Sequence, residues 1–158
     1  MTEVMDWLCG IESDLRAKVD RTDALDDMFQ VSFSGEPEEI EKTSWCLAKM
    51  AQNKVQDMRV YSILMSMRGV SDAVSENICW GLGELAGSGI GDAEGLDYVT
   101  EMMGSPCEPL KSMAAWSAGR MKHRMGLSDP GTDEALEKLR EDDSPLVRMS
   151  AEFAVNPE

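Results

Sequence analysis

The sequence has few of the residues from which catalytic and metal sites are commonly built. It contains one histidine, His123, and its four cysteines, Cys9, Cys46, Cys79 and Cys107, include no CxxC pair. Histidine is the usual proton-transfer side chain near neutral pH, and structural zinc sites need closely spaced cysteines or histidines. We therefore expect free thiols, no metal or other cofactor, no catalytic residue, and a protein that is not an enzyme.

Basic residues are also scarce. The chain has 15 lysines and arginines but 30 aspartates and glutamates, which gives a formal net charge of −15. Acidity by itself keeps a protein soluble, and it also repels phosphates and anionic lipids, which disfavours nucleic-acid and membrane partners. The chain lacks the run of roughly 18 apolar residues that a membrane-spanning helix needs. Its start, MTEVMDWLCGIESDLR, has no basic segment ahead of an apolar one. These features predict a cytoplasmic protein whose partner is another protein.

Aromatic residues make up only 6% of the chain, whereas 13 methionines are present. Leucine, methionine and alanine therefore supply most of the packing, and all three favour helices. Apolar residues recur at helical spacing in nine segments, and no segment alternates with the period of two that is typical of a strand. The eighth segment is predicted to follow the loop LSDPGTD with Thr132 as its cap. We expect one all-α domain over residues 1–158.

Three of the four tryptophans are regularly spaced along the chain. Trp45, Trp80 and Trp116 are 35 and 36 residues apart, in the similar segments TSWCLAKMA, ENICWGLGELAG and MAAWSAGRM. A period of this size is typical of proteins built from repeated helix pairs. Another step of 36 residues reaches Glu152 in the segment RMSAEFAV. The last repeat is therefore predicted to keep the small residues and to lose the tryptophan.

The segment DDSPLVRMSAEFAV resembles the HEAT-like repeat, particularly the variety found in phycobilisome lyase subunits. It has an acidic turn, a proline, a Val-Arg pair and spaced alanines, and GSPCEPLKSMAAWSAGRM is similar. The resemblance covers residues 36–155 and implies a right-handed α-α superhelix, a helical-repeat solenoid of about four helix pairs. Residues 1–35 depart from the pattern and are predicted to form a divergent helical hairpin.

The three periodic tryptophans are expected to share one position on their helices. At about 100° per residue each lies opposite the apolar stripe of its helix, whereas Trp7 lies near the edge of its own stripe. The resemblance implies that the second helix of each pair lines a concave surface. The predicted partner-binding residues are the tryptophans and the residues four positions before them, with one residue of the last repeat: Trp45, Trp80, Trp116, Glu41, Glu76, Ser112 and Arg148.

Packing between repeats is the alternative role for these tryptophans. Gly83 and Gly119 follow Trp80 and Trp116 by three residues, and each could accommodate the ring of a neighbouring tryptophan. Tryptophan is highly buried on average, which favours this alternative. An exposed binding ladder and inter-repeat packing both stay open at this stage.

The function predicted from these features is a non-catalytic adaptor, scaffold, or assembly or maturation factor that binds a subunit of a larger complex through its concave groove. The terminal repeat has no extra polar capping helix, which also indicates self-association. One alternative is a lyase-type or chaperone-like accessory that acts on a cofactor-bearing protein, with His123 as its proton-transfer candidate. A less favoured alternative is a nucleic-acid-binding HEAT-like protein, for which only the cluster of Lys122 and Arg124 speaks.

Overall fold

The structure is a computed structural model that describes residues 2–157. Within these residues it contains nine α-helices, a short 3-10 turn and no strand. The helices are α1 (Glu3–Arg16), α2 (Leu25–Ser34), α3 (Pro37–Gln52), α4 (Met58–Ser66), α5 (Asp72–Gly87), α6 (Ala93–Met102), α7 (Glu108–Met125), α8 (Pro130–Leu139) and α9 (Pro145–Val155), and the 3-10 turn is Thr22–Ala24. The predicted all-α class is confirmed.

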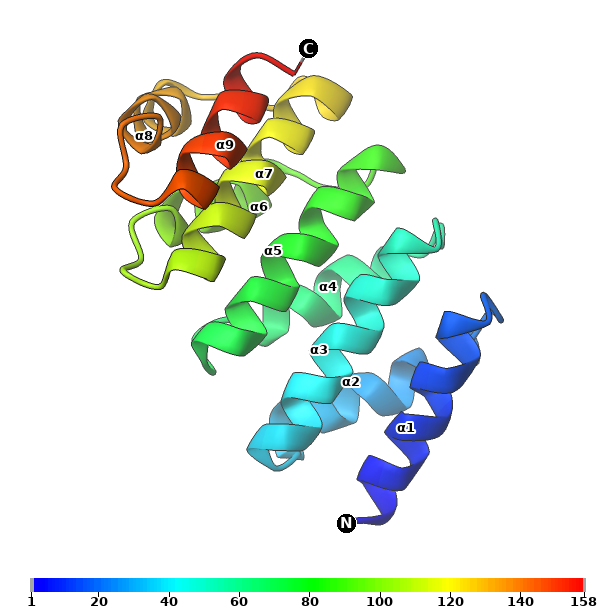
Figure 1. Ribbon diagram of the computed structural model, residues 1–158. Coiled ribbons are helices and arrows are strands. Elements are labelled where there is room, and N and C mark those ends of the chain that lie inside the picture. Colours follow the sequence, from blue (N-terminus) through cyan, green and yellow to red (C-terminus); the bar gives the residue numbers. More distant parts are fainter. Residues whose placement is uncertain (1, 158) are drawn as a thin grey trace.

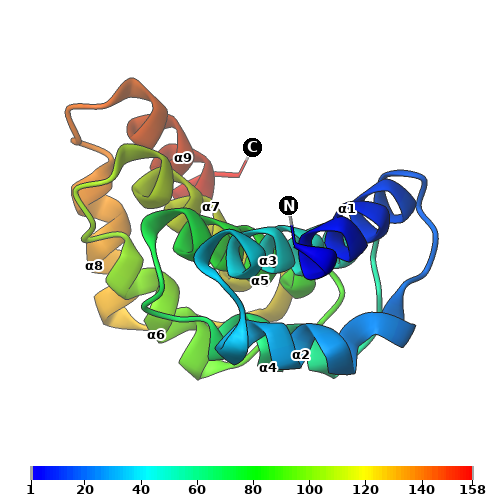
Figure 2. The ribbon, with the colours of Figure 1, turned by 90° about the horizontal axis from the view of Figure 1, so that it is seen from below.

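The helices form two layers. The odd-numbered helices α1 to α9 lie side by side in an inner layer, and α2, α4, α6 and α8 form an outer layer (Figure 1). The two layers curve together, and the inner helices lie on the concave side of the molecule (Figure 2). The most extensive contacts run along the inner layer, from α3 to α5, from α5 to α7 and from α7 to α9. This arrangement is the helical-repeat solenoid that the sequence predicts.

Local sequence signals set where the inner helices begin. The Ser71 hydroxyl accepts a hydrogen bond from the Val74 N–H at the start of α5, and Ser144 does the same for Val147 at the start of α9. Proline occupies the first turn of α3, α7, α8 and α9, where its missing N–H leaves no helix bond unmade. These starts matter because they fix which residue of each helix faces the concave side.

The start of α8 differs from the prediction. The helix begins at Pro130, inside the segment predicted as a loop, and the Asp129 carboxylate caps it by accepting from the N–H groups of Gly131 and Thr132. Thr132 is instead buried, and its hydroxyl shares a 2.7 Å hydrogen bond with the hydroxyl of Thr100 on α6. An aspartate cap followed by proline at the first helical position is the stronger start signal.

The first helix is part of the inner layer and packs against α3. The Thr2 hydroxyl donates a hydrogen bond to the Glu39 carboxylate, and Lys42 Nζ lies 2.5 Å from Glu12 Oε1. This ion pair lowers the pKa of Glu12 and raises that of Lys42. α2 packs on α3 and α4 in the outer layer. The single domain and the boundary near residue 35 stay predictions.

Small residues bring neighbouring inner helices into close contact. A Cβ atom built on Gly119 of α7 would lie 2.7 Å from both the Cα and the Cβ of Ala154 on α9. A Cβ on Gly81 of α5 would lie 3.4 Å from the Cα of Ala48 on α3. The backbone of α9 therefore rests directly on Gly119, and only glycine leaves room for it there.

We expect Gly119→Ala to destabilise the fold, whereas Gly10→Ala should stabilise it. Overpacking at a backbone contact costs about 1–3 kcal/mol, which exceeds the gain of about 1 kcal/mol in helix propensity. Gly10 lies inside α1, and apart from the backbone of its own helix no described part of the chain comes within 4 Å of a built Cβ, so that position should show the propensity gain alone. Urea denaturation followed by circular dichroism measures both variants. Equal shifts of the two midpoints would contradict the close approach of α7 and α9.

Candidate functional site

Four inner helices carry an aromatic residue at the same distance from their starts. The N-caps of α3, α5, α7 and α9 are Glu36, Ser71, Cys107 and Ser144. The ninth residue after each N-cap is Trp45, Trp80, Trp116 and Phe153, respectively. We call these four residues the aromatic rungs. Equal distance from the cap places them at one angular position, on the concave side of the inner layer.

The last repeat has no tryptophan but keeps an aromatic residue, Phe153, one position beyond the Glu152 that the predicted step of 36 residues reaches. The N-caps of α7 and α9 are 37 residues apart, so Phe153 rather than Glu152 takes the position of Trp116. Phe153 is 50% exposed, and Glu152 instead pairs at 2.8 Å with Arg140, the residue that follows α8 as its C-cap. A step of 36 pairs both Ala151 and Ala154 with alanines of α7, whereas a step of 37 pairs only Ala151, so the alanines favoured the wrong step. Counting from the Ser-Pro start of α9 gives the correct step.

The tryptophan rungs are half-buried, so each combines packing with exposure. The rings of Trp45 and Trp80 are a tilted pair, with 6.1 Å between centroids and 59° between planes. The ring of Trp116 rests on the backbone of α5, because a Cβ on Gly83 would lie 2.4 Å from its Cζ3 atom. Gly83 thus accommodates a tryptophan of the next repeat, whereas Gly119 accommodates the backbone of α9.

Charged side chains hold the rungs in place. The Arg16 guanidinium lies 4.7 Å above the Trp45 ring, and that of Arg120 lies 5.6 Å from the Trp116 ring. Glu84 joins two rungs, because it accepts a 3.4 Å hydrogen bond from Trp80 Nε1 and lies 3.8 Å from Arg120. Arginine over an aromatic face is an attractive arrangement. The three tryptophan rungs are therefore ordered before any partner arrives.

Two hollows open beside the rungs. The first, of about 300 Å³, lies among α1, α3 and α5, and Glu41, Trp45 and Glu76 are among its lining residues. The second, of about 420 Å³, lies among α5, α7 and α9. Its lining residues are Glu76, Trp80, Glu84, Pro109, Ser112, Met113, Trp116, Leu146 and Ser150. Together the hollows form what we call the concave groove, and Glu76 lines both of them.

The predicted site residues have different surroundings. Glu41 is exposed and Glu76 half-buried, whereas Ser112 is buried and its hydroxyl shares a 2.6 Å hydrogen bond with Ser150 of α9. Arg148 lines neither hollow. Its guanidinium donates to the backbone carbonyls of Asp142 and Asp143, at 2.6 and 3.1 Å. The structure thus brings six of the seven residues together and turns Arg148 toward the α8–α9 turn.

The comparison with protein families agrees with this architecture. The family described as HEAT repeats matches residues 60–156, which is more than half of the chain. The chain belongs to the HEAT-repeat family. Neither curated proteins nor solved structures gave a match. The phycobilisome lyase-type subclass stays a prediction.

The last HEAT repeat adds an apolar surface that the sequence analysis missed. Leu146, Met149 and Phe153 are 49%, 70% and 50% exposed, and their spacing of three and four residues places them on one face of α9. Leu146 also lines the second hollow, so this face continues the concave groove. Met149 lies five residues after its N-cap, where the preceding HEAT repeats have Glu41, Glu76 and Ser112.

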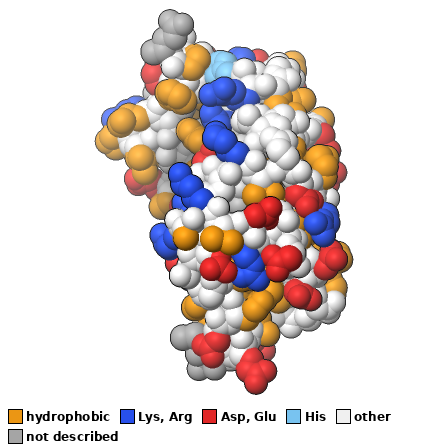
Figure 3. All heavy atoms as spheres, turned by 90° about the vertical axis from the view of Figure 1, so that its right-hand side faces the viewer, with side chains coloured by type: hydrophobic (Ala, Val, Ile, Leu, Met, Phe, Trp, Pro, Cys, Tyr) orange, Lys and Arg blue, Asp and Glu red, His pale blue; other side chains and the backbone are white. Residues whose placement is uncertain are grey.

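The remaining candidates of the sequence lie outside the groove. His123 is exposed near the end of α7, and its Nε2 is 2.7 Å from the Ala154 carbonyl oxygen. Figure 3 shows lysines and arginines around this histidine and mostly acidic side chains lower on the same face. Lys122 in this cluster pairs with Asp133 at 3.3 Å.

Between residues 2 and 157 no group of three potential metal ligands occurs, and no helix there is long and apolar enough to cross a membrane.

The HEAT-repeat core makes two of the four thiols inaccessible. Cys46 and Cys79 are fully buried, Cys107 is half-buried and Cys9 is exposed. Burial raises the pKa of Cys46 to about 12 and also raises that of Cys79, which disfavours the reactive thiolate.

At pH 8 we expect iodoacetamide to label Cys9 first and Cys46 and Cys79 only after unfolding, as measured by mass spectrometry. Equal labelling rates in the folded protein would contradict this burial.

Proposed function

We propose that this HEAT-repeat protein is a non-catalytic binding module that holds a segment of a partner protein across its concave groove. The observation that carries the proposal is the row of four aromatic rungs, one on each of four successive inner helices. Tryptophan contributes a large contact area at a low cost in side-chain entropy and is enriched at binding hot spots. Rungs that are ordered in advance lose little further entropy when a partner binds.

The chemistry of the groove favours an amphipathic helix that carries lysine or arginine. Its apolar residues would meet the open sides of the rungs and of α9, and its cations would meet Glu41 and Glu76. A net charge of −15 attracts such a partner from a distance and disfavours acidic competitors. The role that fits is an adaptor, scaffold or assembly factor for a larger complex.

Affinity purification from the native organism tests this proposal. The baits are the unmodified protein, the variant Trp80→Ala/Trp116→Ala, and Phe33→Ala as a control. Phe33 is 63% exposed on α2 of the outer layer, so its removal takes away an exposed aromatic residue outside the groove. Proteins retained by the unmodified and Phe33→Ala baits but lost from the double variant are the expected result.

A synthetic basic segment of the retained protein should then bind directly, and more weakly as the salt concentration rises. Equal retention by all three baits would contradict groove binding. Sedimentation of the free protein examines the competing occupant, a second copy of the chain. If the protein sediments as a dimer and Met149→Ala dissociates that dimer, the occupant of the groove is a second copy of the chain, bound through α9, and the partner segment is ruled out.

A further inference from the structure

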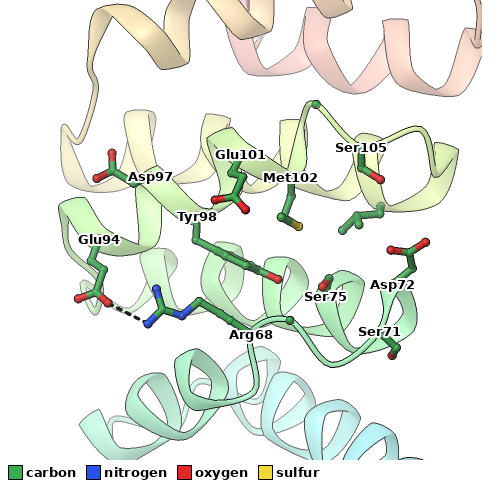
Figure 4. A pocket seen from close by; sticks show the side chains of 13 residues that line it. Arg68, Ser71, Asp72, Ser75, Glu94, Asp97, Tyr98, Glu101, Met102 and Ser105 are labelled. Carbon is green, nitrogen blue, oxygen red and sulfur yellow. Dashed lines mark ion pairs between the residues drawn. The ribbon is translucent and has the colours of Figure 1, made fainter.

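A separate cleft lies outside the concave groove. Its lining residues are all different from those of the two hollows that form the groove. It measures about 840 Å³ and is bounded by the turn after α4, the first turn of α5, and α6. Figure 4 shows its walls, with Arg68 and Ser75 on one side and Glu94, Tyr98 and Glu101 on the other. Pockets that bind small ligands or short peptide segments have volumes of this order.

The floor of this cleft holds a polar group that has no hydrogen-bond partner in the part of the chain that the structure describes. The Tyr98 side chain is 6% exposed, and its hydroxyl forms no hydrogen bond with any described residue. Figure 4 shows the ring running across the cleft toward Ser75, whose hydroxyl is near enough to act on the pKa of Tyr98 and lower it, although the two hydroxyls form no hydrogen bond of normal geometry. Burial raises the pKa of Tyr98 to about 12, so the hydroxyl keeps its proton. Because buried hydroxyls are normally paired, this donor points to an acceptor supplied from outside.

The charges around Tyr98 indicate what accompanies that acceptor. Asp72 on α5 and Glu101 on α6 extend into the cleft from opposite walls (Figure 4), and neither forms an ion pair with a described residue. The one guanidinium of the cleft, that of Arg68, is held by Glu94 at 3.1 Å and by the Met65 carbonyl at 2.8 Å. The lining residues thus leave unpaired negative charge on both walls, which favours a cation.

We propose that this cleft binds a peptide segment containing lysine or arginine, whose backbone carbonyl accepts from Tyr98 and whose side-chain cation lies between Asp72 and Glu101. A peptide supplies both groups at once, whereas a free polyamine supplies cations without the carbonyl. Acidic residues alone would be an ordinary solvated surface. The buried, unpaired donor between them distinguishes this cleft from the other acidic parts of the molecule.

Calorimetric titration with defined probes tests the proposal. The probes are acetyl-Gly-Lys-Gly-amide, acetyl-Gly-Arg-Gly-amide, the neutral acetyl-Gly-Gln-Gly-amide, and spermidine. We expect a basic tripeptide to bind more tightly than the neutral one, and Tyr98→Phe and Glu101→Gln each to weaken it about fivefold. Spermidine should bind the unmodified protein and Tyr98→Phe equally. Equal binding of the neutral and basic tripeptides, or no binding at millimolar concentration, would overturn the proposal.

Two controls separate the cleft from general charge effects and from the groove. Glu134→Gln removes the same charge from an exposed position on α8 and should leave the affinity unchanged. Trp116→Ala should also leave it unchanged, so that failure of the groove and failure of the cleft give different results. The melting temperature of Tyr98→Phe provides a readout independent of binding. It should stay equal or rise, because a fall would show that the hydroxyl is satisfied within the fold and would overturn the proposal.

Discussion

Leu82→Ala is expected to lower the free energy of unfolding by about 2–5 kcal/mol. Leu82 lies on α5, has an exposed fraction of 0%, and belongs to the core that α5 shares with α3 and α7. Truncation removes buried methyl groups and leaves a cavity between packed helices, which cannot close without moving their backbones. Because α5 contacts the helices on both sides of it, the loss weakens two interfaces of the solenoid together.

Leu146→Ala is the matched control, because it deletes the same atoms from a leucine that is 49% exposed on α9. Its cost should stay below about 1 kcal/mol, since much of this side chain already faces water. Guanidinium denaturation followed by circular dichroism at 222 nm measures both variants. A large loss for Leu146→Ala would show that α9 is covered in solution, and a small loss for Leu82→Ala would contradict the core described above.

Trp116→Ala is expected to weaken partner binding by about thirtyfold, which corresponds to about 2 kcal/mol, the usual scale for a hot spot. The ring stands over the second hollow with one side against Gly83 and Arg120 beside it. Because the ring is only half-buried, its loss should cost about 2 kcal/mol of folding stability, below the 3–5 kcal/mol of a fully buried tryptophan. A binding titration and a denaturation midpoint measure the two effects separately.

Trp7→Ala supplies the comparison for this prediction. Trp7 is also half-buried, but it lines a separate hollow with Asp27 and Val31 of the neighbouring α2, away from the rungs. It should show a similar loss of stability and no loss of binding. If Trp7→Ala and Trp116→Ala weaken binding equally, the effect arises from general destabilisation and the groove has no special role.

The helices and their boundaries were accessible from the sequence because their signals are local. Apolar residues at helical spacing predicted all nine helices that the structure describes between residues 2 and 157, and serine caps and first-turn prolines marked most starts. One misplaced start, that of α8, arose from choosing Thr132 over Asp129, two residues three positions apart that can both cap a helix. The spacing of Trp45, Trp80 and Trp116 identified the repeat because equal steps along a solenoid give equal surroundings.

The sequence by itself therefore determined the all-α repeat architecture and the shared position of the three tryptophans. Only the tertiary structure decided how far the tryptophans are buried, because the neighbour of Trp116 is Gly83, which lies 33 residues earlier on another helix. It also decided that Phe153 continues the row and that the Tyr98 hydroxyl has no hydrogen-bond partner among residues 2–157. These features depend on distances between separate helices, and the periodicity of one helix carries no information about such distances.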